Sequence, residues 1–303
     1  MPRTSQRSDG IRIFPPVPED FDARKATPLT LLRHGLPRRP DPKRMPRLAA
    51  IWDEVASQRI RYITPDVKPL AELVPDQARR RQEFGTVTDS AWAGDFLTSN
   101  VAENFVCVGA SWNIADVGPP PGSSQNFWAV NPWVGIDGAD GDTDLCQAGT
   151  TIGYEILSNG TVQKYAVPFF EWVPNTASGM GIGNFPIAFG DTIGCVVCIQ
   201  SPTKAVALFY NHTTQILTSI GFSAPANTTL VGNTAEWIAE ITTPESPVFQ
   251  PITFRDVFAL AQGAETELAD QTGYTLVNCV KNNTPVATAT LIDSHTLEID
   301  YAG

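Results

Sequence analysis

Residues 127–136 read FWAVNPWVGI, residues 191–200 read DTIGCVVCIQ and residues 234–242 read TAEWIAEIT. These runs are rich in β-branched and aromatic residues, and glycine, proline, asparagine and aspartate flank them, which favours strands joined by turns. Similar runs recur about every ten residues from residue 86 onward, a spacing typical of an antiparallel sandwich or barrel. We therefore predict that residues 86–303 are all-β, with only Ala259–Leu268 hinting at a helix.

The first 85 residues differ from the rest in charge and composition. They hold 17 of the 21 Lys and Arg but only 11 of the 32 Asp and Glu, so their net charge is +6 and that of the remainder is −17. Twelve of the 25 prolines lie there as well. We predict two segments: a basic, proline-rich, partly helical extension over 1–85 and a β-sandwich domain over 86–303. Helices are expected at Thr27–Leu36 (Thr27 as N-cap, Pro28 at the first position), Pro46–Tyr62 and Leu70–Phe84.

Several functional classes are disfavoured by composition. An acidic body does not suit nucleic acid, because phosphate binding needs clustered Lys and Arg. No apolar run approaches the roughly 18–20 residues of a membrane span. The N-terminus, MPRTSQRSDGIRIFPPVPEDFD, lacks the apolar core of a secretory signal. The expectation is therefore a cytoplasmic or non-classically exported protein that binds neither nucleic acid nor membrane.

The cysteines and histidines offer little conventional chemistry. An odd number of cysteines without a secretory signal predicts mostly buried free thiols. Cys195 and Cys198 match C-x-x-C, but on a strand they point to opposite faces and would not share a metal. The three histidines, His34, His212 and His295, lie apart in the sequence and are interpreted as surface residues; no G-x-S-x-G motif accompanies them. We predict no metal site.

The acidic segment 137–144 invites a calcium interpretation. An EF-hand that starts at Asp140 would need glycine at its sixth position and glutamate at its twelfth, where the chain has Leu145 and Thr151. A tight acidic turn is the better account.

Five blocks of the β-rich half, taken in order, resemble sequence elements of the glutamic peptidases, a family of acid endopeptidases also called eqolisins. The blocks are Ser90–Gly94, Phe105–Trp112, Trp133–Gly138 with Gln147–Gly149, Phe170–Pro174, and Asn233–Ile238, followed by Phe249–Phe258. One block alone would be weak, but their order and spacing make the match specific. The resemblance implies a lectin-like antiparallel β-sandwich in which one curved sheet forms a substrate groove.

The resemblance also implies a catalytic pair, Gln147 and Glu236, projecting from neighbouring strands into that groove. Glu236 would take a proton from water, since a free glutamate has a pKa of about 4.3 and is still partly ionised in acid. Gln147 would orient the same water and donate to the oxyanion. Strand alternation puts Glu236 on the groove face and Trp237 in the core. The substrate would be a peptide or protein, and the chemistry needs no cofactor.

Further residues follow from the same blocks. The predicted substrate-binding residues are Trp92, Trp133, Asp137 and Glu171. The two tryptophans suit core positions equally well, and the two acids could raise the pKa of Glu236 by like-charge coupling. Val173 stands where the family has a tyrosine, which leaves one wall of the pocket in doubt.

Two alternatives to a peptidase stay open: a lectin-like sandwich that binds glycan or peptide without hydrolysis, and a structural or interaction module with a basic arm. The extension also has two interpretations. Residues 1–85 could inhibit the enzyme intramolecularly as a prosegment held along the acidic groove and released below about pH 4. Otherwise they form a stable accessory layer packed through Leu48, Trp52 and Val55.

Overall fold

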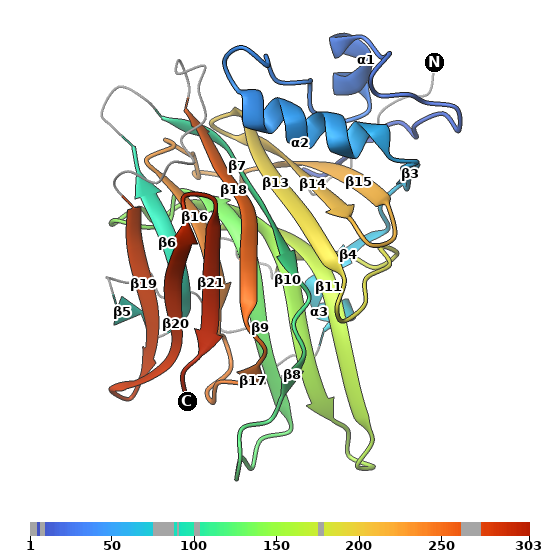
Figure 1. Cartoon of the computed structure of the whole chain (residues 1–303). Helices are drawn as coiled ribbons and strands as arrows, with labels where there is room; N and C mark the ends of the chain where they lie inside the picture. The colour runs from blue at the N-terminus through green and yellow to red at the C-terminus, as the bar shows by residue number, and fades with distance from the viewer. Residues whose placement is uncertain are drawn as a thin grey trace.

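The computed structural model describes residues 10–74, 91–99, 104–174, 179–261 and 274–303, together with the backbone of 5–6 and 88–89. The chain is mostly β, and short helices lie near its N-terminus (Figure 1). The helices are α1 (Pro28–Arg33), α2 (Pro46–Ser57) and α3 (Leu70–Leu73). The strands of the extension are β1 (Ser5–Gln6), β2 (Arg12–Ile13), β3 (Arg61–Tyr62) and β4 (Val67–Pro69), and β5 (Thr88–Asp89) follows it.

Most of the longer strands belong to two sheets. The front sheet contains β4, β12 (Met180–Ile182), β11 (Val162–Val173), β10 (Leu145–Ile156), β9 (Phe127–Ile136), β16 (Thr234–Glu240), β6 (Trp92–Thr98) and β19 (Tyr274–Lys281), in that order. The back sheet contains β20 (Thr284–Asp293), β21 (Thr296–Tyr301), β18 (Ile252–Ala261), β7 (Phe105–Asn113), β13 (Thr192–Ser201), β14 (Lys204–Asn211) and β15 (Ile216–Ser223). A small separate pair joins β8 (Val117–Gly118) to β17 (Val248–Phe249).

The two sheets pack face to face and share one strand. The N-terminal half of β19 pairs with β6 in the front sheet, and its C-terminal half pairs with β20 in the back sheet. The pairings between the long strands are antiparallel, whereas β3 and β5 add short parallel pairings. This is an antiparallel β-sandwich, which confirms the predicted fold class.

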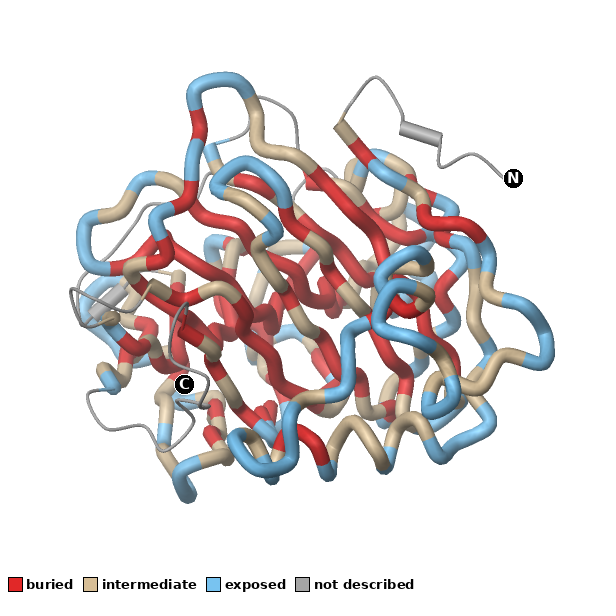
Figure 2. Tube along the Cα trace, turned by 90° about the horizontal axis from the view of Figure 1, so that it is seen from above, coloured by how far each residue is buried: buried red, intermediate tan, exposed pale blue. Residues whose placement is uncertain are grey.

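Strand alternation builds the core between the sheets. On β16, Ala235, Trp237 and Ala239 are buried in the main core, while Ile238 belongs to a separate cluster on the other face of the front sheet. Trp237 is fully buried and its indole N–H donates to the carbonyl of Gly109 on the back sheet (3.1 Å). Figure 2 shows buried backbone through the centre of the molecule and exposed loops around it. The core position predicted for Trp237 is confirmed.

The described part of the extension forms a layer on the outer face of the back sheet (Figure 1). Strand β2 pairs antiparallel with β15, and β3 pairs parallel with it. Helix α1 begins as predicted, because the Thr27 hydroxyl accepts from the backbone N–H of Thr30 (3.2 Å) and Pro28 follows it. Trp52 and Val55 of α2 pack against a cluster that includes Tyr210 and Leu217 of the back sheet. These contacts favour the accessory-layer interpretation.

All four predicted helices differ from the structure. Helix α1 ends at Arg33 instead of Leu36. Helix α2 ends at Ser57 instead of Tyr62, because Arg61 and Tyr62 pair with β15. Helix α3 ends at Leu73, since Val74 precedes a proline and is extended, as the steric clash with a following proline ring requires; the rest of the predicted helix lies outside the described residues. The start of the predicted helix Ala259–Leu268 is strand β18, and its remainder is also outside the described residues. Within the described residues, every helix is too short or too polar to cross a membrane.

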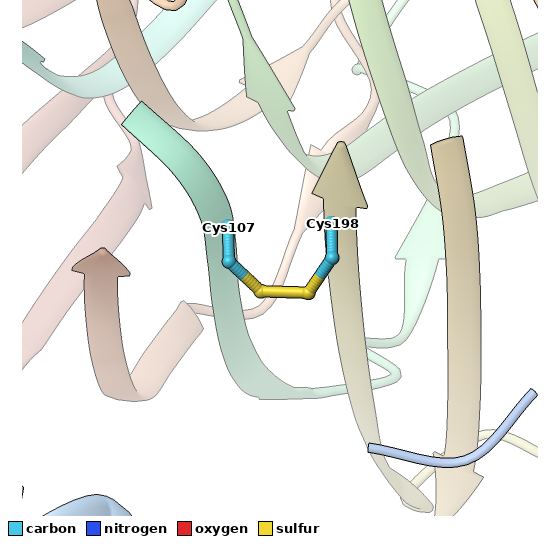
Figure 3. Close-up of a disulfide and its surroundings, with 2 residues drawn as sticks. All are labelled: Cys107 and Cys198. Carbon is cyan, nitrogen blue, oxygen red and sulfur yellow. A yellow bond between two sulfur atoms is a disulfide. The ribbon is translucent and has the colours of Figure 1, made fainter. Parts of the chain in front are cut away.

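Three of the five cysteines are free and buried, as predicted, but the sequence analysis missed one disulfide. Cys107 of β7 and Cys198 of β13 are directly paired across neighbouring strands, and their sulfur atoms are bonded (Figure 3). The other cysteines, Cys146, Cys195 and Cys279, are free and buried. Cys195 lies in the core while Cys198 lies on the outer face of the back sheet, so the prediction that the two thiols point to opposite faces is confirmed.

A carboxyl group lies in the interior at Asp95 of β6. Its neighbours across the strands are Trp237 and Leu276, and the side chain is fully buried. Burial raises the pKa of Asp95 to about 8, and the backbone N–H groups of Thr275 and Phe96 oppose that rise only in part. The folded state therefore holds a proton on Asp95 at pH values where the unfolded chain has lost it.

We expect Asp95 to make the fold less stable as pH rises. Its stabilising contribution is complete below the unfolded pKa near 3.8 and is lost as pH rises toward the folded pKa of about 8. At about 1.4 kcal/mol per pH unit, the wild type should lose several kcal/mol relative to Asp95→Asn between about pH 4 and pH 8. Urea unfolding at the two pH values measures this. Asp20→Asn, an exposed site with the same charge change, should show the same pH dependence of the free energy of unfolding as the wild type. If Asp95→Asn shows that same dependence, the raised pKa of Asp95 is contradicted.

Candidate active site

One row of residues crosses the front sheet from β11 to β16. Glu171 pairs with Gln147, Gln147 pairs with Gly135, and Gly135 pairs with Glu236. Residues directly opposite one another in a sheet point to the same face. The side chains of Glu171, Gln147 and Glu236 therefore share the face turned away from the main core.

The register corrects one detail of the prediction. Gln147 and Glu236 lie on strands that both pair with β9, so they are second neighbours with Gly135 between them. Two strand spacings separate their backbones, roughly 9–10 Å. Sequence spacing could not reveal the intervening strand, because long-range pairing decides which strands are neighbours.

Gly135 leaves space between the two side chains. A Cβ atom at this position would lie 3.2 Å from Oε2 of Glu236, 2.8 Å from Cδ1 of Leu145 and 2.9 Å from the ring of Trp133. The missing side chain thus lets Glu236, Leu145 and Trp133 converge above β9. The sequence analysis did not identify Gly135, because only the register of the strands shows that it lies between Gln147 and Glu236.

Both members of the predicted pair are buried. Gln147 is 2% exposed and Glu236 is 0% exposed. An apolar cluster lies on their face of the sheet, and the described residues assigned to it or packed against it are Trp92, Trp133, Ala139, Leu145, Phe169, Ile238, Val277, Leu70, Ala91, Phe96 and Val173. The expected open, solvated groove is therefore covered in this structure. Val173, at the position where the family has tyrosine, is part of the cover.

Burial controls the ionisation of Glu236. Loss of hydration raises the pKa of Glu236 well above its ordinary value, and the charges of Asp137 and Asp142 raise it further. The Thr234 hydroxyl and the backbone N–H of Ala139 lie close enough to oppose this shift, but neither forms a hydrogen bond of ordinary geometry with the carboxyl oxygens. The predicted coupling to Asp137 is thus confirmed, Glu171 is not among the coupled groups, and Asp142 was missed.

Gln147 and Glu171 form a hydrogen-bonded pair. Nε2 of Gln147 donates to Oε2 of Glu171 (3.2 Å). Burial raises the pKa of Glu171 to about 7, and the hydrogen bonds from Gln147 and from the backbone N–H of Gly179 partly oppose the rise. Glu171 can therefore orient the carboxamide that faces Glu236 across Gly135.

Asp137 holds the loop that leads into β16. Its carboxylate accepts from the backbone N–H groups of Val231 (2.7 Å), Gly232 (3.0 Å) and Asn233 (2.6 Å). Asp137 follows the end of β9 in a left-handed conformation (φ 63°), which aspartate tolerates better than most residues. The carboxylate thereby ties the end of β9 to the start of the Glu236 strand, and it acts in this structure as a positioning residue.

The two predicted tryptophans pack against each other within the cover. The rings of Trp92 and Trp133 meet edge to face with centroids 5.1 Å apart. The indole N–H of Trp133 donates to Oε2 of Glu240 (3.3 Å), a buried residue on the same face as Glu236. Glu240 was missed, although its spacing of four residues from Glu236 on a strand could have signalled it. The substrate-binding role of the tryptophans stays a prediction.

Other acidic side chains of the segment 137–144 form hydrogen bonds with the neighbouring loops. Asp142 accepts from the amide of Asn233 (3.2 Å), and Asp144 accepts from the backbone N–H of Thr229 (2.8 Å). Across the described ranges, no three His, Cys, Asp or Glu side chains are placed to hold a metal ion. The segment is a hydrogen-bonded turn beside the start of β10.

Comparison with known proteins identifies the class that this fold and site define. The model of the Peptidase A4 family matches residues 90–301, so the chain belongs to that family, the glutamic peptidases or eqolisins. Scytalidopepsin B of Scytalidium lignicola is 29% identical over 206 residues, 63% of this chain and 71% of that protein. Aspergillopepsin-2 of Aspergillus niger is 25% identical over 232 residues, 70% of this chain and 77% of that protein.

Solved structures agree on the fold. Scytalido-glutamic peptidase, crystallised with a peptide-based transition state analog, superposes with a TM-score of 0.55 and 23% identity, covering 70% of this chain and 98% of that one. SCP-B, an eqolisin in complex with the tripeptide Ala-Ile-His, gives a TM-score of 0.52 with 21% identity over 70% of this chain and 98% of that one.

The role of Asp137 can be tested by its removal. We expect Asp137→Ala to lower the free energy of unfolding by roughly 2–4 kcal/mol, because it leaves buried backbone donors without their charged acceptor. Thermal and urea unfolding measure the loss. Asp140→Asn changes an exposed residue of the same loop and should stay within about 0.5 kcal/mol of the wild type. An Asp137→Ala protein as stable as that control would show that the loop is held by other contacts.

Proposed function

We propose that this protein is an acid endopeptidase that hydrolyses peptide bonds with Glu236 and Gln147. The observation that carries the proposal is the register: the two side chains stand on one face of the front sheet on either side of a glycine. A carboxyl group and a carboxamide in these positions can both form hydrogen bonds to one water molecule and one peptide carbonyl that lie between them. Membership of the glutamic peptidase family supports the assignment.

The reaction divides between the two groups. Ionised Glu236 takes a proton from water as the water attacks the peptide carbonyl carbon, and later returns it to the leaving amine. Gln147 accepts a hydrogen bond from the water through its carbonyl oxygen and donates to the developing oxyanion through Nε2. An NH₂ group has two donors, so Nε2 can bond the oxyanion while it still bonds Glu171.

Substrate entry must displace the apolar cover. The side chains of Leu145 and Trp133 lie where a peptide backbone would cross Gly135. A peptide with apolar residues beside the scissile bond would replace these contacts with its own, which favours such substrates. Entry of water with the peptide rehydrates Glu236 and lowers its pKa toward the ordinary range, so ionisation of the base accompanies opening of the site.

Digestion of a denatured protein substrate near pH 3–4, with pepstatin present to silence aspartic peptidases, tests the assignment. We expect Glu236→Gln to lower kcat/KM by about 10³-fold or more, since it removes the base, and Gln147→Ala by about 10²–10³-fold. Glu236→Gln keeps the size of a buried neutral carboxyl and should fold normally.

Matched controls are available on the front sheet. Glu155→Gln on β10 and Gln163→Ala on β11 make the same kinds of change far along the sheet from Gly135 and should keep wild-type activity. Equal activity in all five proteins would reject the pair. Binding of glycan or peptide without any hydrolysis would instead support the lectin-like alternative.

We propose that the extension, residues 1–85, partly inhibits the peptidase activity. Strand β4 pairs with β12 at the edge of the front sheet, and the N–H of Leu70 donates to the carbonyl of Gly179 (2.7 Å). Leu70 packs against the apolar cover on the Glu171 side of the row. Two arginines of the extension form ion pairs away from this row: Arg39 bonds Asp53, and Arg47 lies 3.8 Å from Asp256 of β18. Inhibition therefore acts through the Leu70 contact and does not require removal of the extension.

At pH 3–4 we expect the intact chain to cleave substrate while its mass stays unchanged, and Leu70→Ala to raise kcat/KM several-fold by loosening the cover. Leu29→Ala, which changes an exposed leucine of α1, should have no effect. Kinetics combined with intact mass spectrometry give both readouts. Activity that appears only after an N-terminal fragment is lost would instead identify a removable prosegment.

The disulfide bears on the compartment in which the enzyme works. A bond between Cys107 and Cys198 persists in oxidising surroundings and is rare in a reducing cytosol. The bond therefore supports an oxidising compartment outside the cytoplasm.

A further inference from the structure

The outer face of the back sheet is unusually apolar. Alternate residues of β13 and β14 point inward to the core, such as Cys195 and Phe209. The residues between them point outward, and these are also apolar: Val196 on β13, Leu208 on β14 and, on β18, Phe258. Outer faces of antiparallel sheets commonly meet water and carry polar residues. The apolar side chains on this face instead favour its burial against other apolar groups.

The helical layer covers this face only in part. Helix α2 crosses above β13 and β14 (Figure 1), with Ile51, Trp52 and Val55 facing the sheet. Between the helix and the sheet a cavity of about 430 Å³ remains. That volume lies within the range of about 300–1,000 Å³ that small-molecule sites occupy. The cavity opens to solvent, so water contacts its apolar lining, and an apolar occupant that displaces this water is favoured.

One polar pair interrupts the apolar lining. Oγ of Ser111 on β7 lies 3.1 Å from Nε2 of His212, and the two meet across Gly194 on β13. A Cβ atom at Gly194 would lie 2.9 Å from Nε2 of His212 and 3.2 Å from Oγ of Ser111, so glycine there makes room for the pair. The ring of Tyr210 packs against His212 with centroids 4.6 Å apart and fixes its orientation.

The surroundings of the pair favour an uncharged partner. Burial lowers the pKa of His212, and Asp256 and Glu54 oppose this only in part, so the imidazole is neutral near pH 7. Asp256 and Arg38 both line the cavity, and Arg47 lies 3.8 Å from Asp256, so its rim carries charges of both signs. The lining between them is apolar, and a charged group would lose hydration on entering it. A hydroxyl and a neutral imidazole together supply one donor and one acceptor.

We propose that this cavity binds a neutral amphipathic small molecule, whose apolar chain or ring system lies between α2 and the back sheet and whose single hydroxyl or carbonyl group bonds Ser111 and His212. The site is separate from the Gln147–Glu236 row, which lies on the front sheet. Its occupant would complete the packing of the N-terminal layer against the sandwich.

The experiment uses the full-length chain and the neutral fluorophore 1-N-phenylnaphthylamine at pH 7. We expect saturable fluorescence enhancement that 1-dodecanol, below its solubility limit, displaces. Val196→Trp fills the cavity and should weaken binding of the fluorophore at least tenfold, and Ala56→Trp does the same from the helix should the first variant fail to fold. Val162→Trp, an exposed site on β11, should bind like the wild type.

The proposed hydrogen bonds from the ligand to Ser111 and His212 are tested in the same assay. Ser111→Ala should leave binding of the fluorophore unchanged and weaken displacement by 1-dodecanol about five- to tenfold. Dodecanoate should compete less well than 1-dodecanol at pH 7. Glu236→Gln should bind both ligands as the wild type does, so loss of peptidase activity leaves this result intact. Absence of saturable binding, undiminished binding in the cavity-filled variants, or stronger competition by dodecanoate would overturn the proposal.

Discussion

The site depends on the register of one strand. Strand β9 pairs on one side with β10 and on the other with β16, and both pairings meet at Gly135. A shift of either pairing by one residue would turn Gln147 or Glu236 toward the opposite face, into the main core. Core packing on both flanking strands opposes such a shift, because it would withdraw Trp237 from the main core and break its hydrogen bond to the carbonyl of Gly109. Core packing and catalytic geometry are thus one constraint.

Electrostatics follows from that geometry. Because register fixes Glu236 and Glu171 on a face that apolar side chains cover, dehydration, more than any charge, dominates the pKa of each. The carboxylate of Asp137 has a different role, since it accepts hydrogen bonds from three backbone N–H groups. The site therefore contains two kinds of buried acid. Asp137 is held by hydrogen bonds and keeps the loop in place. Glu171 and Glu236 are shielded from water and are available to carry a proton.

The sequence was a good guide wherever local pattern decides structure. Strands β9 and β11 coincide with their predicted runs, and the N-cap of α1 was identified from Thr27 and Pro28. It was a poor guide wherever distant segments meet. The intervening strand at Gly135 and the Cys107–Cys198 bond both depend on long-range register. The covered state of Glu236 depends on apolar side chains contributed by many separate strands, which no single motif encodes.

The two faces of the sandwich place opposite demands on what covers them. Under the proposed mechanism, the cover over Gln147 and Glu236 has to yield, because peptide and water would have to reach Gly135. The cover over Val196, Leu208 and Phe258 has to stay, because removal of the helical layer would expose a continuous apolar surface of the kind that drives association. The extension is tied to both faces, through β2 and β3 at the back and through β4 at the front edge. It therefore links the stability of the sandwich to access to the site: contacts that hold the layer on the back sheet also hold Leu70 against the cover of the front sheet.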